Sequence, residues 1–499
     1  MHKKIMLQGT GSSVGKSILT AGLCRIFAQD GYKVAPFKSQ NMALNSFVDI
    51  DGKEMSRAQV VQAEACNTIP RCFMNPILLK PTGEDNCSQV IIEGVPFKNM
   101  NAQEYYSNSE KLKKIALRNY NKLKKEYEIG VLEGAGSPAE INLRELDLVN
   151  MGMAELVNAP VVLIGDIERG GVFASIYGTV MLLDDADRNR IKGYIINKFR
   201  GDESLLNKGI EMLDNALKKH GLDIPCLGII PFTKINLEKE DSYTYDSLTS
   251  QVPEKDINIA VIKFDKMSNS TDFSSLLMYD DVNLQYVETA EQLTDNYDII
   301  ILPGSKNAIY DFSLTKERKI AKKIQELAEA GKIIIGIHSG FQMLGKSIKD
   351  LEQVESSYLK IEGMGLLDIT TKMESKKYTK QVSVTLENCT GILEGFNGLQ
   401  INGYEIHQGV TTGDTNYSVA DDKGFSIICR DNIIGTYIHG IFDTPKFTRK
   451  LLNKVRIKKG LEPIFDYMNI ETFKEKEYKR LAKIMRSHLD MEKIYSILK

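Results

Sequence analysis

Apolar residues occur in short runs along the first two hundred residues, and longer stretches of helical character separate these runs. Alternation of strand-like and helical segments is typical of a parallel sheet covered by helices on both faces. We therefore expect an α/β domain in this part of the chain. The strand-like runs read KKIMLQG, YKVAPFK, YEIGVLEG, APVVLIGDI and IKGYIINKF.

A second series of strand-like runs begins near Asp256, and a helix expected from Glu317 to Ala330 interrupts it. The same alternation predicts a second α/β unit. Its strand-like runs read INIAVIKF, VNLQYV, YDIIILPGS, KIIIGIHSG and IIGTYIHGIFD.

The polar segment EKEDSYTYDSLTSQVPEK lies between the two series, contains one proline and lacks apolar periodicity. This composition is typical of a linker between domains, and 499 residues are too many for one ordinary core. The lysine-rich end of the chain has a helical pattern, and we expect a solvated amphipathic helix packed on the second domain. The predicted division is a domain at 1–234, a linker at 235–255, a domain at 256–446 and a helical tail at 447–499.

Composition argues against several classes of function. A formal net charge of −2 supplies no field that would attract nucleic acid, so we expect no nucleic-acid binding. No apolar run approaches the roughly 18 residues of a membrane span, and the N-terminus MHKKIMLQGT lacks a targeting segment, so we expect a cytoplasmic protein. Seven scattered cysteines without ligand spacing predict neither a disulfide framework nor a zinc site. The pattern leaves a homo-oligomer open.

The clearest chemical motif is GTGSSVGKS, which follows an apolar strand and opens the helix ILTAGLCRIFAQ. This is the context of a phosphate-binding loop. Its backbone amides would cradle phosphates, while the lysine neutralises the β- and γ-phosphates and the last serine ligates Mg²⁺. We therefore expect ATP and Mg²⁺ as cofactors. The nucleotide-binding residues are Gly9, Thr10, Gly11, Ser12, Ser13, Val14, Gly15, Lys16 and Ser17, with Thr10 where the usual first glycine falls.

Two further residues at strand ends are candidates for the same site. Glu133 follows the strand of YEIGVLEG and precedes small residues, so we expect it to hold Mg²⁺ together with Ser17. Lys38 ends the strand YKVAPFK, where it would neutralise the transferred phosphoryl group or a substrate carboxylate. The plain alternatives are a solvated or helix-capping carboxylate for Glu133 and a surface lysine for Lys38.

A set of longer motifs runs through both halves of the chain. The first half carries FKSQNMALNSFVDIDGKEMSRAQVVQAEAC, MNPILLKP, SQVIIEG, LEGAGSPAEINL, LVNMGMAELVNAPVVLIGDIERGGVFASIYGT and INKFRGD, and the second half carries LPGSKNAIYD, GFQMLG, GYEIHQG and GTYIHGIFD. Together they resemble the cobyric acid synthase family, and the spacing of the phosphate loop is similar to that of the dethiobiotin-synthetase type. Because so many motifs occur in the same order, the resemblance is specific, and it covers nearly the whole chain.

The resemblance implies an α/β fold with two parts, an N-terminal parallel-sheet domain of P-loop NTPase type and a C-terminal, flavodoxin-like domain of glutamine amidotransferase type. It implies a ligase that amidates peripheral carboxylates of a corrinoid, cobyrinic acid a,c-diamide, with ATP and with nitrogen from glutamine or ammonia. An acyl phosphate would give each carboxylate a leaving group that ammonia displaces. Asp166 and the RGG of residues 169–171 follow the strand VVLIGD, and we assign them to the substrate or nucleotide side.

One position departs from the family pattern. Family amidotransferase domains carry a cysteine nucleophile in a pattern like GICGGYQMLG, whereas this chain reads GIHSGFQMLG from Gly336 to Gly345. His338 therefore occupies the position of the cysteine, and Ser339 that of a glycine. His439, in GTYIHG, matches the histidine that moves protons. Without a thiol, glutamine hydrolysis is not expected to proceed in the family's way.

Several alternatives stay open for this second site. The domain could serve docking while free ammonia supplies nitrogen, or Ser339 or His338 could sustain weak hydrolysis, or the residue could be engineered or erroneous. Backbone donors near Gly304 and Ser339 would frame an oxyanion site. His407, in GYEIHQG, fits a core or hydrogen-bonding residue better than a catalytic one.

Two other functions compete with the leading one. The first is the related enzyme that amidates the a and c carboxylates of the same ring, against which FKSQNMALNS and INKFRGD argue. The second is a P-loop ATPase switch whose degenerate second domain only binds a partner. The order of carboxylates, the path of ammonia and the residues that contact the corrinoid are not encoded in any of these motifs.

Overall fold

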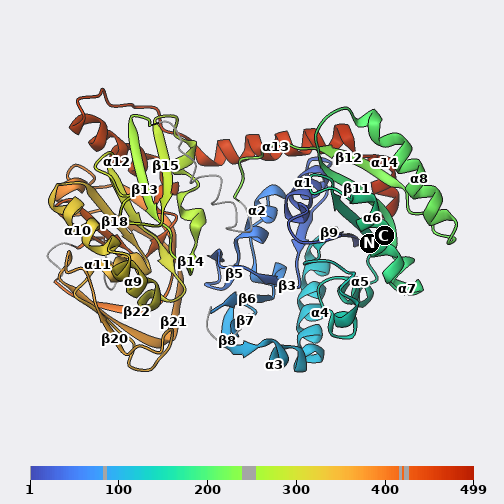
Figure 1. Cartoon of the computed structure of the whole chain (residues 1–499), viewed down its shortest axis with the longest axis horizontal. Helices are drawn as coiled ribbons and strands as arrows, with labels where there is room; N and C mark the ends of the chain where they lie inside the picture. Colours follow the sequence, from blue (N-terminus) through green and yellow to red (C-terminus); the bar gives the residue numbers. More distant parts are fainter. Residues whose placement is uncertain (1, 83–86, 239–253, 415–417, 421–425, 499) are drawn as a thin grey trace.

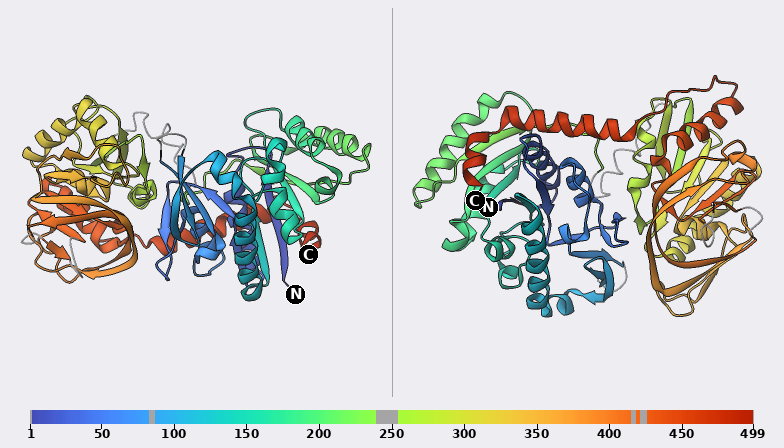
Figure 2. Two further views of the ribbon diagram at one scale, coloured as in Figure 1. Left: turned by 90° about the horizontal axis from the view of Figure 1, so that it is seen from below. Right: turned by 180° about the vertical axis from the view of Figure 1, so that it is seen from behind.

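A computed structural model describes residues 2–82, 87–238, 254–414, 418–420 and 426–498. Two lobes lie side by side, and the long helix α13 (Ile470–His488) runs from the inner edge of the second lobe across the top of the first (Figure 1). Seen from below and from behind, the two lobes remain separate bodies in contact along one face (Figure 2). The predicted linker falls mostly on residues 239–253, which lie outside the described part of the chain.

The first lobe is built on a six-stranded sheet with every neighbouring pair parallel. All six residues of its central strand β10 are buried, because helices cover both faces of the sheet. The predicted parallel α/β domain is confirmed. The strand order is β12 (Cys226–Pro231), β11 (Ile191–Phe199), β10 (Val161–Asp166), β1 (Lys3–Gly9), β9 (Ile129–Glu133) and β2 (Val34–Phe37).

Two apolar clusters cover the two faces of this sheet. Helices α1 and α13 lie on one face, and α4, α5, α6 and α8 lie on the other. The helices of this lobe are α1 (Lys16–Gln29), α2 (Arg57–Ala65), α3 (Ala102–Ser107), α4 (Ser109–Glu126), α5 (Met151–Val157), α6 (Val172–Leu182), α7 (Asp185–Arg188) and α8 (Asn207–Lys218).

An insertion after β2 forms the side of the first lobe that faces the second (Figure 1). It contains a four-stranded sheet and a two-stranded hairpin. The sheet has the order β3 (Gln40–Met42), β6 (Ile77–Pro81), β7 (Cys87–Ile92) and β8 (Val95–Asn101), and the hairpin pairs β4 (Ser46–Val48) with β5 (Glu54–Ser56).

The second lobe contains a sheet whose five parallel strands follow the flavodoxin-like order 2-1-3-4-5. The expected flavodoxin-like fold is confirmed, with two antiparallel strands added at one edge. The full order is β15 (Val282–Val287), β13 (Ile257–Ile262), β16 (Ile299–Leu302), β18 (Ile333–Ile337), β25 (Ile433–Thr436), β24 (Ile427–Arg430) and β23 (Ser418–Ala420), and the helices are α9 (Ala308–Glu317), α10 (Ile320–Glu329), α11 (Ser339–Leu344) and α12 (Pro445–Lys458).

A further five-stranded sheet of the second lobe faces the insertion of the first lobe (Figure 1). Long antiparallel strands dominate it. Its order is β20 (Lys360–Glu362), β19 (Ser347–Lys349), β21 (Ile369–Thr385), β22 (Gln400–Gly413) and β26 (Ile438–His439), and a separate two-stranded pair joins β14 (Met267–Ser268) to β17 (Gly304–Ser305).

The tail does not pack as predicted from its pattern. Helix α12 does lie on the second lobe, but α13 packs on α1 of the first lobe, where Tyr478, Leu481 and Met485 join the core. A Cβ at Gly22 would collide with the sulfur of Met485, so the glycine allows the two helices to touch. The expectation that the whole tail covers the second domain is therefore wrong, and α14 (Met491–Ile497) also ends on the first lobe.

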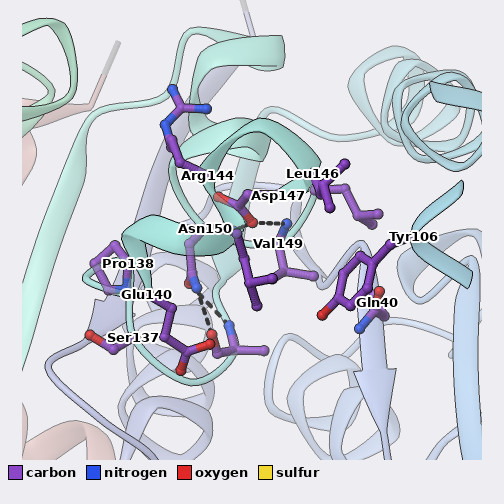
Figure 3. Close-up of a pocket in the computed structure, with 13 residues that line it drawn as sticks. Gln40, Tyr106, Ser137, Pro138, Glu140, Arg144, Leu146, Asp147, Val149 and Asn150 are labelled. Atoms are coloured by element: carbon purple, nitrogen blue, oxygen red, sulfur yellow. Dashed lines mark hydrogen bonds between the residues drawn. The ribbon is translucent and has the colours of Figure 1, made fainter. Parts of the chain in front are cut away.

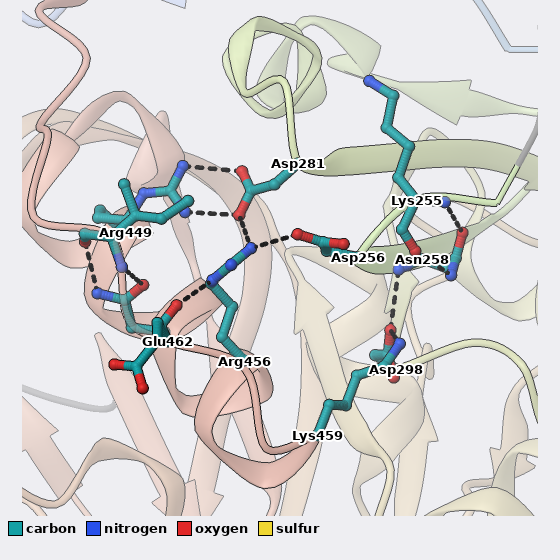
Figure 4. Close-up of polar contacts among 11 residues, drawn as sticks. Lys255, Asp256, Asn258, Asp281, Asp298, Arg449, Arg456, Lys459 and Glu462 are labelled. Carbon is teal, nitrogen blue, oxygen red and sulfur yellow. Dashed lines mark hydrogen bonds and ion pairs between the residues drawn. The ribbon is translucent and has the colours of Figure 1, made fainter.

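Charged side chains fix α12 to the amino-terminal edge of the second sheet (Figure 4). Arg449 donates to both carboxylate oxygens of Asp281 at 2.8 and 2.9 Å. Arg456 donates to Asp256 at 2.7 Å and to Asp281 at 3.2 Å. The bidentate pair of Arg449 with Asp281 and the two contacts of Arg456 fix the direction in which the tail leaves the second lobe.

Three observations concern membrane spans, cysteines and metal ligands in the described part of the chain. No described helix combines the length and apolarity that crossing a membrane requires. All seven cysteines are free thiols, and the described histidines, cysteines and carboxylates form no group of three or more that could hold a metal ion.

Candidate functional site

The phosphate loop joins β1, which ends at Gly9, to α1, which begins at Lys16. Gly15 adopts a left-handed backbone with φ of 99°, and a Cβ there would collide with the Asn197 side chain. Asn197 Nδ2 in turn donates to the carbonyl of Val14 at 2.8 Å. The loop is therefore supported from β11, which places its amides at the carboxyl edge of the sheet.

Lys16 connects the phosphate loop to the segment that follows β9. Its Nζ atom donates to the carbonyl of Gly11 at 2.9 Å and to that of Gly136 at 3.0 Å. A Cβ at Gly9 would lie only 2.9 Å from the same Nζ atom, so this glycine makes room for the lysine. The amine is thus held over the loop, where a P-loop lysine meets phosphate oxygens.

The structure brings Ser17, Lys38 and Glu133 together, although they are far apart in the sequence. Glu133 is 1 % exposed, and its Oε1 accepts from Ser17 Oγ at 2.9 Å and from Lys38 Nζ at 2.9 Å. Its Oε2 accepts from Gln62 Nε2 at 2.5 Å. The serine hydroxyl and the carboxylate are hard oxygen donors of the kind that Mg²⁺ prefers, so this pair fits the ion. Sequence reasoning missed Gln62, although it lies within the motif FKSQNMALNSFVDIDGKEMSRAQVVQAEAC.

Asp166 reaches the phosphate loop through a lysine that sequence reasoning also missed. Lys198 Nζ donates to Asp166 Oδ2 at 2.8 Å and to the carbonyl of Ser13 at 2.7 Å. Lys198 has φ of 62°, which few non-glycine residues adopt. Of the RGG segment, Arg169 lies 3.8 Å from Asp166 with its side chain mostly exposed. The signal for Lys198 was its position at the end of the strand in INKFRGD.

A cavity of about 70 Å³ lies beside the phosphate loop (Figure 3). The segment after β9, to which Lys16 is hydrogen-bonded, forms part of its wall. Gln40 of β3 and Tyr106 form the opposite side. Asn150 shapes this wall, because its Nδ2 donates to the Ala135 carbonyl at 2.6 Å. A group bound here would lie next to the lysine and the carboxylate of the phosphate site.

The second candidate site lies at the sharp turn between β18 and α11. His338 occupies this turn with φ of 54° and ψ of −111°. Gly340 is required behind it, because a Cβ there would collide with the carbonyl of Leu302. A strained strand-to-helix elbow of this kind presents a nucleophile in other enzymes. The elbow is preserved here although an imidazole replaces the expected thiol.

His439 faces the elbow and is held by a carboxylate. Its Nδ1 lies 2.7 Å from Asp272 Oδ2, and the other oxygen of Asp272 accepts from the Gly440 amide at 3.1 Å. The ring centroids of His439 and His338 are 5.5 Å apart. His439 is fully buried, and within the described residues its Nε2 has no hydrogen-bond partner. Sequence reasoning missed Asp272, since no motif links positions 167 residues apart.

The two residues considered as alternative nucleophiles are adjacent at the elbow. Ser339 Oγ donates to the Ser305 carbonyl at 2.9 Å and lies 3.3 Å from His338 Nδ1. Burial lowers the pKa of His338 well below its usual range, and the neighbouring His439 lowers it further. His338 is therefore a neutral imidazole in a closed site. A Cβ at Gly304 would lie 3.1 Å from His338 Nδ1, which places that segment against the elbow as expected.

His407 has a supporting position. Its ring stacks on Tyr437 with centroids 4.0 Å apart, and its Nδ1 lies 2.7 Å from the Gly409 carbonyl. Both neighbours fix the ring in place. This geometry agrees with the interpretation of His407 as a hydrogen-bonding residue.

A buried ion cluster lies between the lobes beside the second site. Glu54 of β5 accepts from Lys80 at 3.0 Å and from Lys377 of the second lobe at 2.6 Å. Burial alone would raise the pKa of Glu54, but the two lysines lower it to about 2. Tyr404 of β22 donates to the Ser46 carbonyl at 2.8 Å and stacks on His439 with centroids 5.2 Å apart. The insertion of the first lobe therefore closes the second site.

Comparisons with known proteins agree with this two-site architecture. Residues 5–243 match the CobQ/CobB/MinD/ParA nucleotide binding domain, and residues 258–447 match the CobB/CobQ-like glutamine amidotransferase domain. The chain is 47% identical to the cobyric acid synthase of Caldanaerobacter subterraneus subsp. tengcongensis, over 100% of this chain and 99% of that protein. It is also 47% identical to that of Clostridium botulinum (strain ATCC 19397 / Type A), over 99% of each.

The fold and the two matched domains define an ATP-dependent ligase that carries a glutamine amidotransferase domain. Identity at this level over the full length of both chains identifies the particular group. The chain belongs to the cobyric acid synthase family.

Proposed function

We propose that this chain amidates peripheral carboxylates of cobyrinic acid a,c-diamide to give cobyric acid, with ATP as the energy source. The observation that carries the proposal is the convergence of Lys16, Ser17, Lys38 and Glu133 beside a cavity at the carboxyl edge of the first sheet. These residues suit phosphoryl transfer to a carboxylate, because catalysis there rests on positioning and charge neutralisation.

The reaction proceeds in two steps. A carboxylate oxygen of the corrinoid attacks the γ-phosphorus of ATP, ADP leaves, and an acyl phosphate forms. The nitrogen lone pair of ammonia then attacks the acyl carbon, one proton is lost, and inorganic phosphate leaves with its bonding electrons. Lys16 neutralises charge on the phosphates, and Lys38 does so on the transferred group or on the carboxylate.

Ser17 and Glu133 would hold Mg²⁺, whose charge neutralises the phosphate oxygens when the ion is bound. Gln62 orients the carboxylate through its other oxygen. Lys198 joins Asp166 to the phosphate loop. We assign to this lysine the role of holding the loop closed over the nucleotide. The cavity in Figure 3 is the proposed place for the reacting carboxylate arm.

Nitrogen comes from free ammonia in this proposal. A glutaminase needs a nucleophile that forms and releases a glutamyl ester or thioester, and a thiol is suited to this. His338 is buried and neutral and carries no thiol, while the hydroxyl of Ser339 donates a hydrogen bond to a backbone carbonyl. No cysteine occurs between Cys226 and Cys389 to replace it.

The proposed division of labour follows the sequence boundaries. Residues 1–234 act as the synthetase domain and 256–446 as the amidotransferase-like domain, with 235–255 as the linker and 447–499 as the tail. Two sheets support this division, because the strands of the first lie within Lys3–Pro231 and the parallel strands of the second lie within Ile257–Thr436.

The experiment is a reconstitution with purified protein, ATP, Mg²⁺, cobyrinic acid a,c-diamide and ammonium chloride. We expect mass spectrometry to detect replacement of carboxyl hydroxyls by amino groups, with ADP formed in proportion. ADP release without any corrinoid amide would contradict the proposal and would favour an ATPase switch.

A further inference from the structure

Gln62 of α2 carries a buried polar atom that has no partner in the described part of the chain. The residue is 1 % exposed. Its Nε2 atom donates to Glu133 Oε2 at 2.5 Å and to the carbonyl of Ser17 at 3.4 Å. Its Oε1 atom accepts no hydrogen bond from any described residue. Because a buried acceptor without a donor is costly, this oxygen indicates a ligand that donates a hydrogen bond.

The neighbours of the Gln62 amide fix its orientation. Both groups beside Nε2, a carboxylate oxygen and a backbone carbonyl, are acceptors, so the nitrogen must face them. A reversed amide would place Oε1 against two other acceptors. The two end atoms of an amide are roughly 2.3 Å apart. At most about 5 Å therefore separates Oε1 from Glu133 Oε2, a gap that one water molecule bridges.

Ser17 and Glu133 leave positions for water on a bound ion. Their side-chain oxygens are 2.9 Å apart, and neighbouring ligands of an octahedral Mg²⁺ at about 2.1 Å lie about 3.0 Å from each other. The two side chains therefore fit two adjacent positions of the ion. Phosphates of a nucleotide take further positions, and Mg²⁺ keeps waters in the rest. Such a water is a strong hydrogen-bond donor, because the cation polarises its O–H bonds.

Helix α2 is fixed at both ends, so the Gln62 amide is held in place before any ligand binds. At its start, Arg57 donates to Glu238 at 2.8 Å. At its end, the carbonyl of Ala65 accepts from Arg25 of α1 at 3.3 Å. Gln62 lies between these two contacts and next to the proposed metal ligand. A rigid amide behind a metal ligand is the arrangement that orients metal sites in proteins.

We propose that Gln62 is a positioning residue of the metal site, in which Oε1 accepts a hydrogen bond from a water bound to the ion while Nε2 orients the Glu133 carboxylate. One side chain thus fixes the ion through two of its ligands. This inference deepens the proposed function and rests on it for the presence of the metal. It can be tested with a nucleotide analogue and without the corrinoid.

The test compares the full chain with its Gln62→Met variant, because methionine has a similar length and lacks the amide. Calorimetry measures the affinity for β,γ-imido-ATP, an analogue that resists transfer of its last phosphoryl group, once with Mn²⁺ and once with EDTA. We expect the gain in affinity that Mn²⁺ confers to fall at least about tenfold in the variant, as for other groups behind a metal ligand. The affinity in EDTA should be unchanged, which reports an intact fold and phosphate loop.

Oxygen-17 relaxation of the solvent follows the bound water itself. Mn²⁺ relaxes the ¹⁷O nuclei of the waters that it binds, and the exchange of these waters with solvent sets the observed rate. We expect the water held by Gln62 to exchange at least about fivefold faster in Gln62→Met, the loss of one hydrogen bond. A residue that only orients the carboxylate would leave the exchange rate unchanged.

Gln59 provides a matched control on the same helix. It is also buried, and its Nε2 atom also has no partner among the described residues. Its Oε1 accepts from Asn41 Nδ2 at 3.3 Å, and no described hydrogen bond joins it to Ser17 or Glu133. Gln59→Met should therefore change neither the Mn²⁺ gain nor the exchange of water.

Three results would overturn the role of Gln62: an undiminished Mn²⁺ gain in Gln62→Met, water exchange equal to that of the parent, or equal losses in Gln59→Met. Losses confined to Gln62→Met in a protein that amidates no corrinoid would support the role and would reject the proposed function alone.

Discussion

The Nδ1 atom of His439 lies 2.7 Å from Oδ2 of Asp272, across 167 residues of sequence. A carboxylate in this position fixes the tautomer of the histidine and leaves Nε2 free to take a proton. This pair lies beside His338, the residue that we expect to stand where the family pattern has a cysteine.

This relationship predicts how glutamine use could be restored. His338→Cys, with Ser339→Gly to relieve the elbow, should produce glutamine hydrolysis, because the new thiol would face His439. Adding Asp272→Ala to that variant should lower the hydrolysis rate at least about a hundredfold, since the base loses its orientation. Glutamate release measures both effects. Asp265→Ala, which changes an exposed aspartate of the same lobe, should leave the rate intact, and an equal loss there would refute the role of Asp272.

A second prediction concerns Lys16, whose amine bridges Gly11 and Gly136. Lys16→Ala should abolish amidation with either nitrogen source, by orders of magnitude, because the phosphates lose their positive partner. Circular dichroism should show an unchanged fold. Parental turnover of ATP and corrinoid by this variant would mean that the phosphate loop has been misassigned.

A third prediction concerns Glu133, which Ser17, Lys38 and Gln62 all contact. Glu133→Gln should raise the Mg²⁺ concentration needed for half-maximal turnover more than it weakens corrinoid binding, because an amide is a poorer ligand than a carboxylate. Titrations of turnover with MgCl₂ measure this. Glu126→Gln, at an exposed end of α4, is the matched control. Superimposable titration curves for Glu133→Gln and the parent would place the ion elsewhere.

A fourth prediction concerns the stability of the contact between the lobes. Glu54→Gln leaves Lys80 and Lys377 without their buried anion, which should cost about 3 kcal/mol of unfolding free energy near pH 6. The two lysines hold the pKa of Glu54 at about 2, below its unfolded value of 4.5. Its stabilising contribution is therefore present above pH 4.5 and is lost as the pH falls toward 2.

Urea unfolding of the parent and the variant at several pH values measures this contribution. The difference in unfolding free energy between them should be largest at about pH 5 to 6 and should shrink as the pH falls below 5, because the pKa of Lys377 is lowered to about 7 and this lysine stays charged in the parent over that range. Exposed Glu145→Gln should show no such difference. A difference that stayed the same down to the acid transition would show that the charge of Glu54 has no part in the contact.

Much of the phosphate site could be predicted from sequence, and the reason is geometric. Lys38 and Glu133 lie at or just after the carboxyl ends of parallel strands, and the phosphate loop after β1 brings Lys16 and Ser17 to the same edge of the sheet. Gln62 could not be predicted, because it lies on a helix and reaches Glu133 only after α2 has packed.

The second site and the tail show where the pattern was insufficient. Asp272 and Tyr404 reach His439 from distant segments, and only the closed structure brings them together. For α13, the amphipathic pattern indicated an apolar face but not which lobe would cover it. Packing on the first lobe requires Gly22 of α1, because a Cβ at this position would collide with Met485 of α13.

The most direct test of the account compares two nitrogen sources in the unaltered protein. Purified enzyme, ATP, Mg²⁺ and cobyrinic acid a,c-diamide are incubated with glutamine labelled with ¹⁵N in its side-chain amide and with unlabelled ammonium chloride, and the label in the corrinoid amides is measured by mass spectrometry. The account predicts corrinoid amides that carry no ¹⁵N and a rate that rises with pH as ammonium is deprotonated to ammonia. Corrinoid amides carrying ¹⁵N from glutamine, formed at a rate comparable to total amidation, would contradict it.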